Sequence, residues 1–358
     1  MRGPAPRGRM GVSIYARAVT LAGRSTHACR WTHEHARRIA LLGILFLSLD
    51  PPGPLRAQQS LQDFVDVLRR GRRGALIVSN PRTGEILALA NPETVFDRAF
   101  PPGSTAKLVE SAVALEEGLI SPGDRIFCRQ VPELLGRAYR CSHAPAVAPF
   151  TLRSALANSC NYFFAALSVR LTSTSLAHGY AVFGFGSPVA GPWPAANAGQ
   201  VRIGDEPRAK ARAALGESTV LVTPAQLLLA YSAIATRGFV FRLWKPSAGQ
   251  HHSPLLLRRV KLRSETFEVL REGLEECVRS GTGGGAAVEG VRVAGKTGTA
   301  AALDQSGATH AWFVGYAPAE DPEIALVVFL ERGTSIRDAA PLAGRILQRY
   351  FAGKGRKP

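Results

Sequence analysis

Ser104 and Lys107 stand three residues apart at a predicted helix start, in "FPPGSTAK" at residues 100–107. Positions i and i+3 share a helix face, so the lysine can hydrogen-bond the serine hydroxyl and, once deprotonated, act as its general base. Lysine suits this task because burial lowers its pKa, whereas arginine stays charged. The chain has only seven lysines against 37 arginines, and this is its only Ser-x-x-Lys. The alternative interpretation is a capped helix with a surface lysine.

A second polar group, Ser159 and Asn161, flanks Cys160 where two short helical stretches meet within residues 151–170. On such a tight connection both polar side chains can point into a cleft. Serine and asparagine also favour helix ends for purely local reasons, so turn chemistry is the alternative.

The third group is "GKTGTA" at residues 295–300, on a predicted strand. Alternation along a strand places Lys296 and Gly298 on one face and Thr297 and Thr299 on the other. A glycine there allows a ligand backbone to approach closely, although a glycine-containing edge strand needs no ligand.

Other chemical patterns lack their required context. "GTGGG" at residues 281–285 follows a predicted helix and enters a strand, the reverse of a phosphate-binding loop. The sequence contains no H-E-x-x-H and no G-x-S-x-G, and His310 is interpreted as structural. No C-x-x-C pair occurs, so cysteine spacing does not predict a zinc site, and we expect no metal.

Five cysteines occur in the chain. Cys29 would leave with an export signal. Cys128 and Cys141 flank one polar loop and are close enough in sequence for a disulfide in an oxidising compartment. Cys160 and Cys277 have apolar neighbours and are interpreted as small buried hydrophobes.

The elements that must position these groups are strands at both ends of the chain and helices between them. Residues 74–91 predict a β-hairpin around "NPRTG", and three β-type runs follow one another within residues 291–331. Helical patterns occur at 105–118, 151–170, 223–238, 264–280 and roughly 335–351. We therefore expect an α/β fold, with one mixed sheet made from both ends and an all-helical insertion. An active site could lie in the seam between them.

The formal net charge is +17, and residues 1–38 contribute +7 of it through eight arginines and Glu34. The apolar run at residues 39–49 is shorter than the roughly 20 residues that a membrane span needs. This pattern, with a small residue at Ala57, predicts an export signal, with an uncleaved anchor as the alternative. We expect a basic region at 1–57 and one domain at 58–358, with the helical part at about 97–285. An exported chain is an improbable nucleic-acid partner.

In the order S-x-x-K, S-x-N, K-T-G, the three groups resemble the penicillin-binding protein transpeptidase domain of the serine D,D-peptidase and β-lactamase superfamily. The resemblance covers roughly residues 74–350 and is closest to the class B, monofunctional members. It extends to "TGEILALAN", "ALANSCNYFF", "TPAQLLLAYSAIATRG" and "AWFVGYAPAEDPEIALVVFLE". It implies a sheet of about five antiparallel strands flanked by helices, with a helical subdomain beside it.

The resemblance also implies a role for each motif residue in peptidoglycan cross-linking, with no cofactor. Ser104 would attack the carbonyl of a D-Ala-D-Ala stem peptide and Lys107 would take its proton. The implied roles of the others are proton relay to the leaving group for Ser159, substrate backbone binding for Asn161, and carboxylate binding with proton movement for Lys296, Thr297 and Thr299. The backbone N–H groups of Ser104 and Thr299 would form the oxyanion hole.

Implied partners are peptidoglycan stem peptides, β-lactams, and a membrane-embedded glycosyltransferase or other wall-synthesis proteins. The implied location is the periplasm or the outer face of the cytoplasmic membrane. Two features depart from the family pattern: Ala106 stands where many relatives carry a larger apolar residue, and little chain separates Ala57 from Ser104, where class B enzymes usually carry a long docking region. The alternatives are a class D-like β-lactamase or β-lactam sensor, a D,D-carboxypeptidase, and a non-catalytic binding module.

Overall fold

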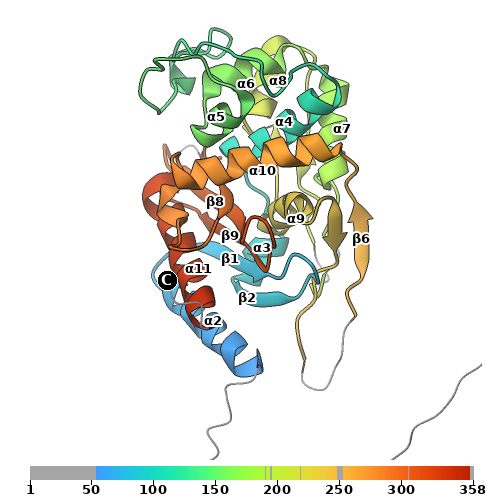
Figure 1. The fold of residues 1–358 in the computed structure, drawn as a ribbon, viewed down its shortest axis with the longest axis vertical. Coiled ribbons are helices and arrows are strands. Elements are labelled where there is room, and N and C mark those ends of the chain that lie inside the picture. Colours follow the sequence, from blue (N-terminus) through green and yellow to red (C-terminus); the bar gives the residue numbers. More distant parts are fainter. Residues whose placement is uncertain are drawn as a thin grey trace, which may run out of the picture. The chain divides into compact units, whose positions relative to one another are not determined.

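A five-stranded sheet forms the centre of the computed structural model (Figure 1). The structure describes residues 54–189, 191–193, 196–217, 219–247, 253–304 and 306–354, all within one compact unit that begins at Pro52. The predicted export signal therefore lies mostly outside the described residues. Helix α2, Pro54–Arg69, runs across the domain boundary expected at residue 57. No described helix has the length and apolar character that crossing a membrane requires.

The strand order is β2-β1-β9-β8-β7, so the two ends of the chain do build one sheet, as expected. All four pairings are antiparallel, as the family resemblance implied; the sheet is not mixed. The strands are β1 (Gly74–Ser79), β2 (Ile86–Ala90), β7 (Ala294–Ala301), β8 (Thr309–Ala317) and β9 (Ile324–Leu330). Strand β7, which carries "GKTGTA", lies at the edge of this sheet.

Helices cover both faces of the sheet, which explains its long apolar runs. In β9, Leu326 and Val328 belong to a core with α2 and α11 (Ala340–Ala352), whereas Val327 and Phe329 face the opposite core. That opposite face packs against α9 (Pro224–Ala235), while α10 (Ser264–Arg279) contacts β7. A central strand covered on both sides reads as a continuous apolar run.

The helices from α4 to α8 gather beyond α10, at the top of Figure 1, whereas α3 lies against β1 and α9. Thr151 and Thr223 begin α5 and α9 as capping-box residues, satisfying the first backbone N–H groups. The insertion is not all-helical, because it includes the two-stranded ribbons β3–β4 and β5–β6. The remaining elements are α3 (Pro92–Phe96), α4 (Lys107–Glu116), α5 (Leu152–Ala157), α6 (Asn161–Ser168), α7 (Ser173–Phe183), β3 (Gln200–Val201), α8 (Pro207–Ala214), β4 (Val220–Leu221), β5 (Phe239–Phe241) and β6 (Leu256–Arg259).

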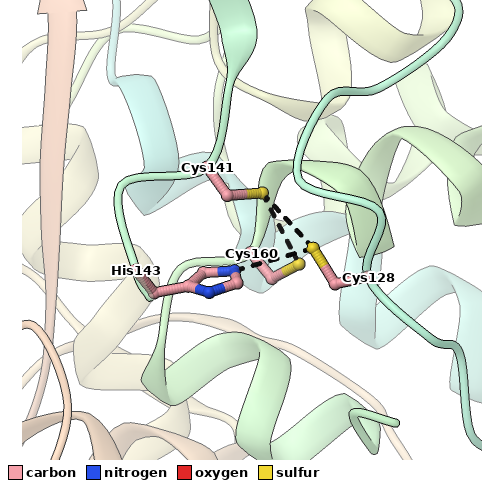
Figure 2. Close-up of side chains that lie close together, drawn as sticks. All are labelled: Cys128, Cys141, His143 and Cys160. Carbon is pink, nitrogen blue, oxygen red and sulfur yellow. Dashed lines mark hydrogen bonds between the residues drawn. The ribbon is translucent and has the colours of Figure 1, made fainter. Parts of the chain in front are cut away.

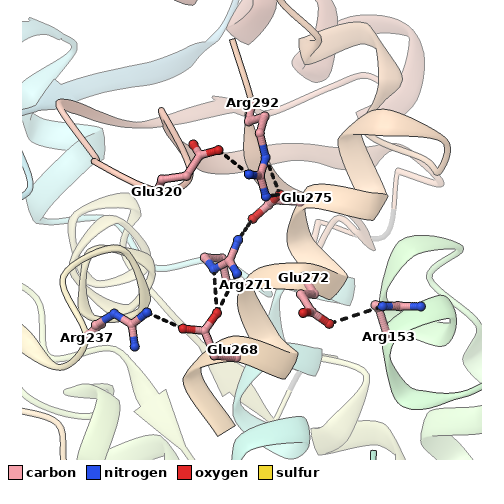
Figure 3. Close-up of polar contacts among 8 residues, drawn as sticks. All are labelled: Arg153, Arg237, Glu268, Arg271, Glu272, Glu275, Arg292 and Glu320. Atoms are coloured by element: carbon pink, nitrogen blue, oxygen red, sulfur yellow. Dashed lines mark hydrogen bonds and ion pairs between the residues drawn. The ribbon is translucent and has the colours of Figure 1, made fainter. Parts of the chain in front are cut away.

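Helix α10 ties the helical part to the sheet through its acidic outer face (Figure 3). Glu275 pairs with Arg271 on the same helix and, at 2.5 Å, with Arg292 just before β7. Glu272 pairs with Arg153 of α5 at 3.2 Å. Isolated surface ion pairs contribute little, whereas the connected set around Glu275 holds α10 against the segment before β7 more effectively.

Candidate active site

Ser104 lies in a 3₁₀ turn, Gly103–Ala106, that runs directly into α4. Gly103 has φ +55°, and a Cβ there would lie 2.6 Å from the carbonyl oxygen of Thr299 on β7. Only glycine can therefore bring this turn so close to the edge strand. The half-buried Ser104 consequently stands at the start of a helix, where a developing negative charge is favoured.

Lys107, the first residue of α4, is completely buried. Burial, and then the positive charge of Lys296, lower the pKa of Lys107 from its ordinary 10.5 to about 7. At pH 7 an ordinary lysine would be neutral in roughly one molecule in 3,000, whereas this one is neutral in about half. Lys107 is therefore not a surface lysine, and its lowered pKa is the property that a general base at neutral pH needs.

Ser159 and Asn161 face the amine of Lys107 and also line the cleft into which sequence analysis expected them to point. The Lys107 Nζ donates to the carbonyl oxygen of Ser159 (2.8 Å), the Oγ of Ser159 (3.2 Å) and the Oδ1 of Asn161 (2.7 Å). Ser159 has φ +53°, a left-handed conformation that costs a non-glycine residue about 1–2 kcal/mol. That conformation is what allows both the carbonyl and the hydroxyl of Ser159 to reach one amine.

A protonated Lys107 has three N–H groups, which match the three acceptors around it. A neutral amine has two N–H groups and one lone pair, so one of the three neighbours must then donate a hydrogen bond to it. Only the hydroxyl of Ser159 can reverse its role, because a carbonyl oxygen cannot donate. Deprotonating Lys107 therefore couples to a rotation of the Ser159 hydroxyl, which is the chemical property of a proton relay. Asn161 also donates to the carbonyl of Tyr139 at 3.1 Å, so its amide joins Lys107 to the preceding loop.

Lys296 is fully buried, and its Nζ donates to the carbonyl of Thr297 at 3.1 Å. Burial lowers the pKa of Lys296 as well. Lys296 is absent from the described lining of the cleft, so the structure does not place its amine where a substrate carboxylate would bind. Its clearest contribution is the charge that lowers the pKa of Lys107.

The backbone of β7 presents donors at the open edge of the sheet. The N–H of Ala302 donates to the carbonyl of Ala308 at 2.9 Å, which places this pair in the hydrogen-bonded class. Because the two classes alternate along an antiparallel ladder, Thr297 and Thr299 point their N–H and C=O groups away from β8. The Thr299 N–H is thus directed as an oxyanion-hole donor would require.

Gly298 makes a close contact within the protein itself. A Cβ on Gly298 would lie 2.6 Å from the carbonyl oxygen of Pro102 and 2.8 Å from the Cγ2 of Thr105. The close approach is therefore made by the protein's own turn around Ser104. Gly298 allows the nucleophile turn to pack against β7.

Five of the motif residues, Ser104, Ser159, Asn161, Thr297 and Thr299, line a cleft of about 640 Å³. Thr282 donates to or accepts from the hydroxyl of Thr297 (2.5 Å), and the hydroxyl of Thr299 donates to that of Ser335 (2.9 Å). Sequence analysis missed Thr282 and Ser335, since only the fold brings them beside β7. The lining residues are Ser104, Arg140, Ser142, Ser159, Asn161, Thr282, Thr297, Thr299, Thr334, Ser335, Ile336 and Arg337.

The composition of this lining is informative. Among the described residues that line the cleft there is no aspartate, glutamate or histidine. The exposed Arg140 and Arg337 supply positive charge instead. The cleft is thus suited to an anionic substrate, and its described lining offers no carboxylate or imidazole to activate a water molecule.

The cysteines correct one expectation and confirm another. Cys128 and Cys141 are free in the structure, with their sulfur atoms 3.7 Å apart, whereas a disulfide needs about 2.05 Å. The expected bridge is therefore absent from the structure. Cys160 and Cys277 are fully buried, as predicted, but Cys160 has the sulfur of Cys141 as a neighbour at 3.8 Å.

Comparison with known proteins matches residues 74–348 to the model of the penicillin binding protein transpeptidase domain. The chain is 30% identical over 323 residues to stage V sporulation protein D of Bacillus subtilis, covering 79% of this chain and 49% of that protein. It is 27% identical over 378 residues to the peptidoglycan D,D-transpeptidase MrdA of Acinetobacter baumannii, covering 88% and 55%. The chain thus spans about half the length of these two relatives.

Solved structures agree on the fold. The D,D-transpeptidase domain of a peptidoglycan glycosyltransferase from Eggerthella lenta superposes with a TM-score of 0.71 at 26% identity, covering 84% of this chain and 81% of that one. Penicillin-binding protein A from Mycobacterium tuberculosis, solved as a ceftriaxone acyl-enzyme complex, gives 0.70 at 25% identity, covering 82% and 78%. With its sheet, its motif cleft and its match to the family model in agreement, this chain belongs to the penicillin-binding protein transpeptidase domain family.

Proposed function

We propose that this chain is a serine D,D-transpeptidase that cross-links peptidoglycan through an acyl-enzyme on Ser104. The observation that carries the proposal is the buried amine of Lys107, whose pKa is lowered to about 7 and which contacts Ser159 and Asn161 at a cleft that Ser104 also lines. Burying a lysine lowers the stability of the fold, and buried residues with shifted pKa values are common at active sites, where a neutral lysine can activate a nucleophile.

In the first step, Lys107 takes the hydroxyl proton of Ser104 while Oγ attacks the carbonyl carbon of the penultimate D-alanine. The negative charge that develops on the carbonyl oxygen is met by the N–H groups of Ser104 and Thr299. One such preorganised donor is worth about 3–4 kcal/mol in acyl-transfer enzymes. The peptide C–N bond then breaks, and the proton passes from Lys107 through the Ser159 hydroxyl to the leaving D-alanine.

In the second step, an amine of a neighbouring stem peptide attacks the ester and releases Ser104 with its proton restored. The open edge of β7 can pair with the extended substrate backbone, as an added strand would. Arg140, Arg337 and the threonine hydroxyls of β7 are the groups we propose for the terminal carboxylate of the donor, in place of the buried amine of Lys296.

The cleft lining distinguishes this proposal from the β-lactamase alternative. A β-lactamase must activate water to hydrolyse its acyl-enzyme rapidly, whereas a transpeptidase must protect the ester until an amine arrives. The described lining contains no aspartate, glutamate or histidine, which favours a long-lived ester. A D,D-carboxypeptidase would use the same first step, with water as the acyl acceptor in the second. Our proposal also includes wall-synthesis partners and a location outside the cytoplasm.

The test is the lifetime of a penicilloyl adduct on the purified full chain, followed by intact-mass spectrometry. We expect a covalent adduct at Ser104 that lasts tens of minutes or longer, and none in Ser104→Ala. An adduct lost within seconds, with steady hydrolysis of the antibiotic, would favour a β-lactamase. Folded protein that forms no adduct would favour a binding module and overturn the proposal.

A further inference from the structure

Four potential metal ligands converge beside the Ser-x-Asn motif, outside the residues that carry the reaction (Figure 2). They are the sulfur atoms of Cys128, Cys141 and Cys160 and the imidazole of His143, and the four ligand atoms all lie within 4.8 Å of one another. The three cysteines are buried and the histidine is half-buried. Cys128, Cys141 and His143 come from the segment between α4 and α5, and Cys160 is the N-cap of α6.

The spacing of these atoms matches a tetrahedral zinc site. The sulfur of Cys141 lies 3.7 Å from that of Cys128 and 3.8 Å from that of Cys160, and Cys128 Sγ lies 3.8 Å from the Nε2 of His143. With Zn–S bonds near 2.3 Å and Zn–N bonds near 2.0–2.1 Å, the edges of a tetrahedron are about 3.8 Å for S···S and about 3.6 Å for S···N. The observed separations are thus close to those of ligands around one ion.

The surroundings orient each ligand for metal binding. The Nδ1 of His143 lies 2.7 Å from the carbonyl of Ala144, so Nδ1 carries the proton and the lone pair of Nε2 faces the cysteines. Ligating histidines usually make this second hydrogen bond, which fixes the tautomer and the ring orientation. A carbonyl cannot donate, so the other tautomer would lose this contact.

Each sulfur also accepts a backbone N–H, which favours the thiolate that a metal requires. Gln130 donates to Cys128 at 3.3 Å, and Tyr162 donates to Cys141 at 3.4 Å. Phe163 donates to Cys160 at 3.4 Å, across the first turn of α6. The three sulfur atoms thus converge, and each has its own amide donor. A disulfide would involve only two of them, whereas one metal ion can bind all three.

We propose that Cys128, Cys141, His143 and Cys160 bind one Zn²⁺ as a closed, structural site. Cys₃His is an established zinc ligand set, and four protein ligands leave no open position for catalysis. The thiol protons leave as the three Zn–S bonds form, while His143 binds through its lone pair and keeps the Nδ1 proton. Binding is therefore weakened in acid.

The position of Cys160 gives the ion a consequence for the active site. Cys160 lies between Ser159 and Asn161, the two residues that hold the amine of Lys107. Arg140, which lines the cleft, is adjacent to Cys141. The ion would thus join the loop that carries Arg140 to the turn that carries the Ser-x-Asn motif. This consequence rests on the proposed function, whereas zinc binding itself does not.

The first experiment measures zinc per chain by inductively coupled plasma mass spectrometry, on full-length protein purified without chelators. We expect one zinc per chain, falling to near zero in Cys128→Ser and in His143→Ala. Cys277→Ser is the matched control, because Cys277 is a buried cysteine outside the cluster and its loss should leave the zinc in place. Equal zinc loss in Cys277→Ser would show that the metal depends only on general folding.

Wild-type protein provides a test that no folding defect can confuse. Replacing zinc with Co²⁺ should give the intense visible band of tetrahedral cobalt and a near-ultraviolet thiolate band. Chelation should then slow acylation of Ser104 by a penicillin, with readdition of zinc restoring it. Wild-type protein without zinc and without a thiolate–cobalt spectrum, or with a Cys128–Cys141 or Cys141–Cys160 disulfide in non-reducing peptide maps, would overturn the site. A zinc-loaded chain that forms no acyl-enzyme would overturn only the proposed function.

Discussion

The rate at which a penicillin acylates Ser104 should follow the ionisation of Lys107. The pKa of Lys107 is lowered to about 7, so its neutral fraction is about a tenth at pH 6, a half at pH 7 and nine tenths at pH 8. Only the neutral amine can accept the Ser104 proton. We therefore expect the second-order acylation constant to rise about tenfold from pH 6 to pH 8, and then to level off.

A lysine with its ordinary pKa of 10.5 gives a different profile, because its neutral fraction grows about tenfold with every pH unit up to pH 9 and beyond. The assay is stopped-flow or quenched intact-mass measurement at constant ionic strength. This second-order constant reports the ionisation of the free enzyme. Ser104→Ala sets the zero, and Lys107→Arg should acylate negligibly at every pH while staying folded. A rate that keeps rising above pH 8, or one independent of pH, would refute the assignment of Lys107 as the base.

Lys296→Met separates the two causes of the lowered pKa within the same assay. Removing that charge should move the inflection to higher pH, because the like charge no longer disfavours protonation of Lys107. Burial remains the larger cause, so the inflection should stay well below pH 10.5. An unchanged inflection would show that Lys296 acts on the reaction by another route.

Two further variants test the packing around the site. Gly298→Ala should displace the turn that carries Ser104, lower the free energy of unfolding by about 1–3 kcal/mol through overpacking, and slow acylation sharply. Gly123→Ala is the control, because a Cβ there meets nothing within 4 Å. Urea unfolding and adduct assays should find its stability and its acylation rate near those of the wild type. Burial raises the pKa of Glu110, whose carboxylate oxygens have no described hydrogen-bond partner. As pH rises above about 4.5, Glu110 therefore loses its proton in the unfolded chain before it does so in the folded one, and its contribution to the free energy of unfolding should fall. Glu110→Leu should remove that part of the pH dependence, and identical pH–stability curves for the two proteins would contradict the argument.

The sequence by itself determined the motifs and most of the elements that hold them. The apolar run of β9 and the glycine-containing strand β7 each follow from local rules about burial and alternation. The three motifs likewise pointed to five residues that line the cleft, although Thr282 and Ser335 escaped them; the five are Ser104, Ser159, Asn161, Thr297 and Thr299. Such properties are local, so they can be recognised without knowing how the chain folds.

Only the tertiary structure decided the burial, the electrostatic surroundings and the packing neighbours of those residues. The pKa of Lys107 depends on complete burial and on Lys296, which is distant in sequence, so no motif could predict its value. Gly298 lies against the Ser104 turn because two segments that are distant in sequence pack at van der Waals distance. Cys128 and Cys141 suggested a pair in the sequence, but folding adds His143 and Cys160 and turns the pair into four converging ligands. Charge, close packing and ligand geometry all depend on distances in space, and those distances are set only when the whole chain is folded.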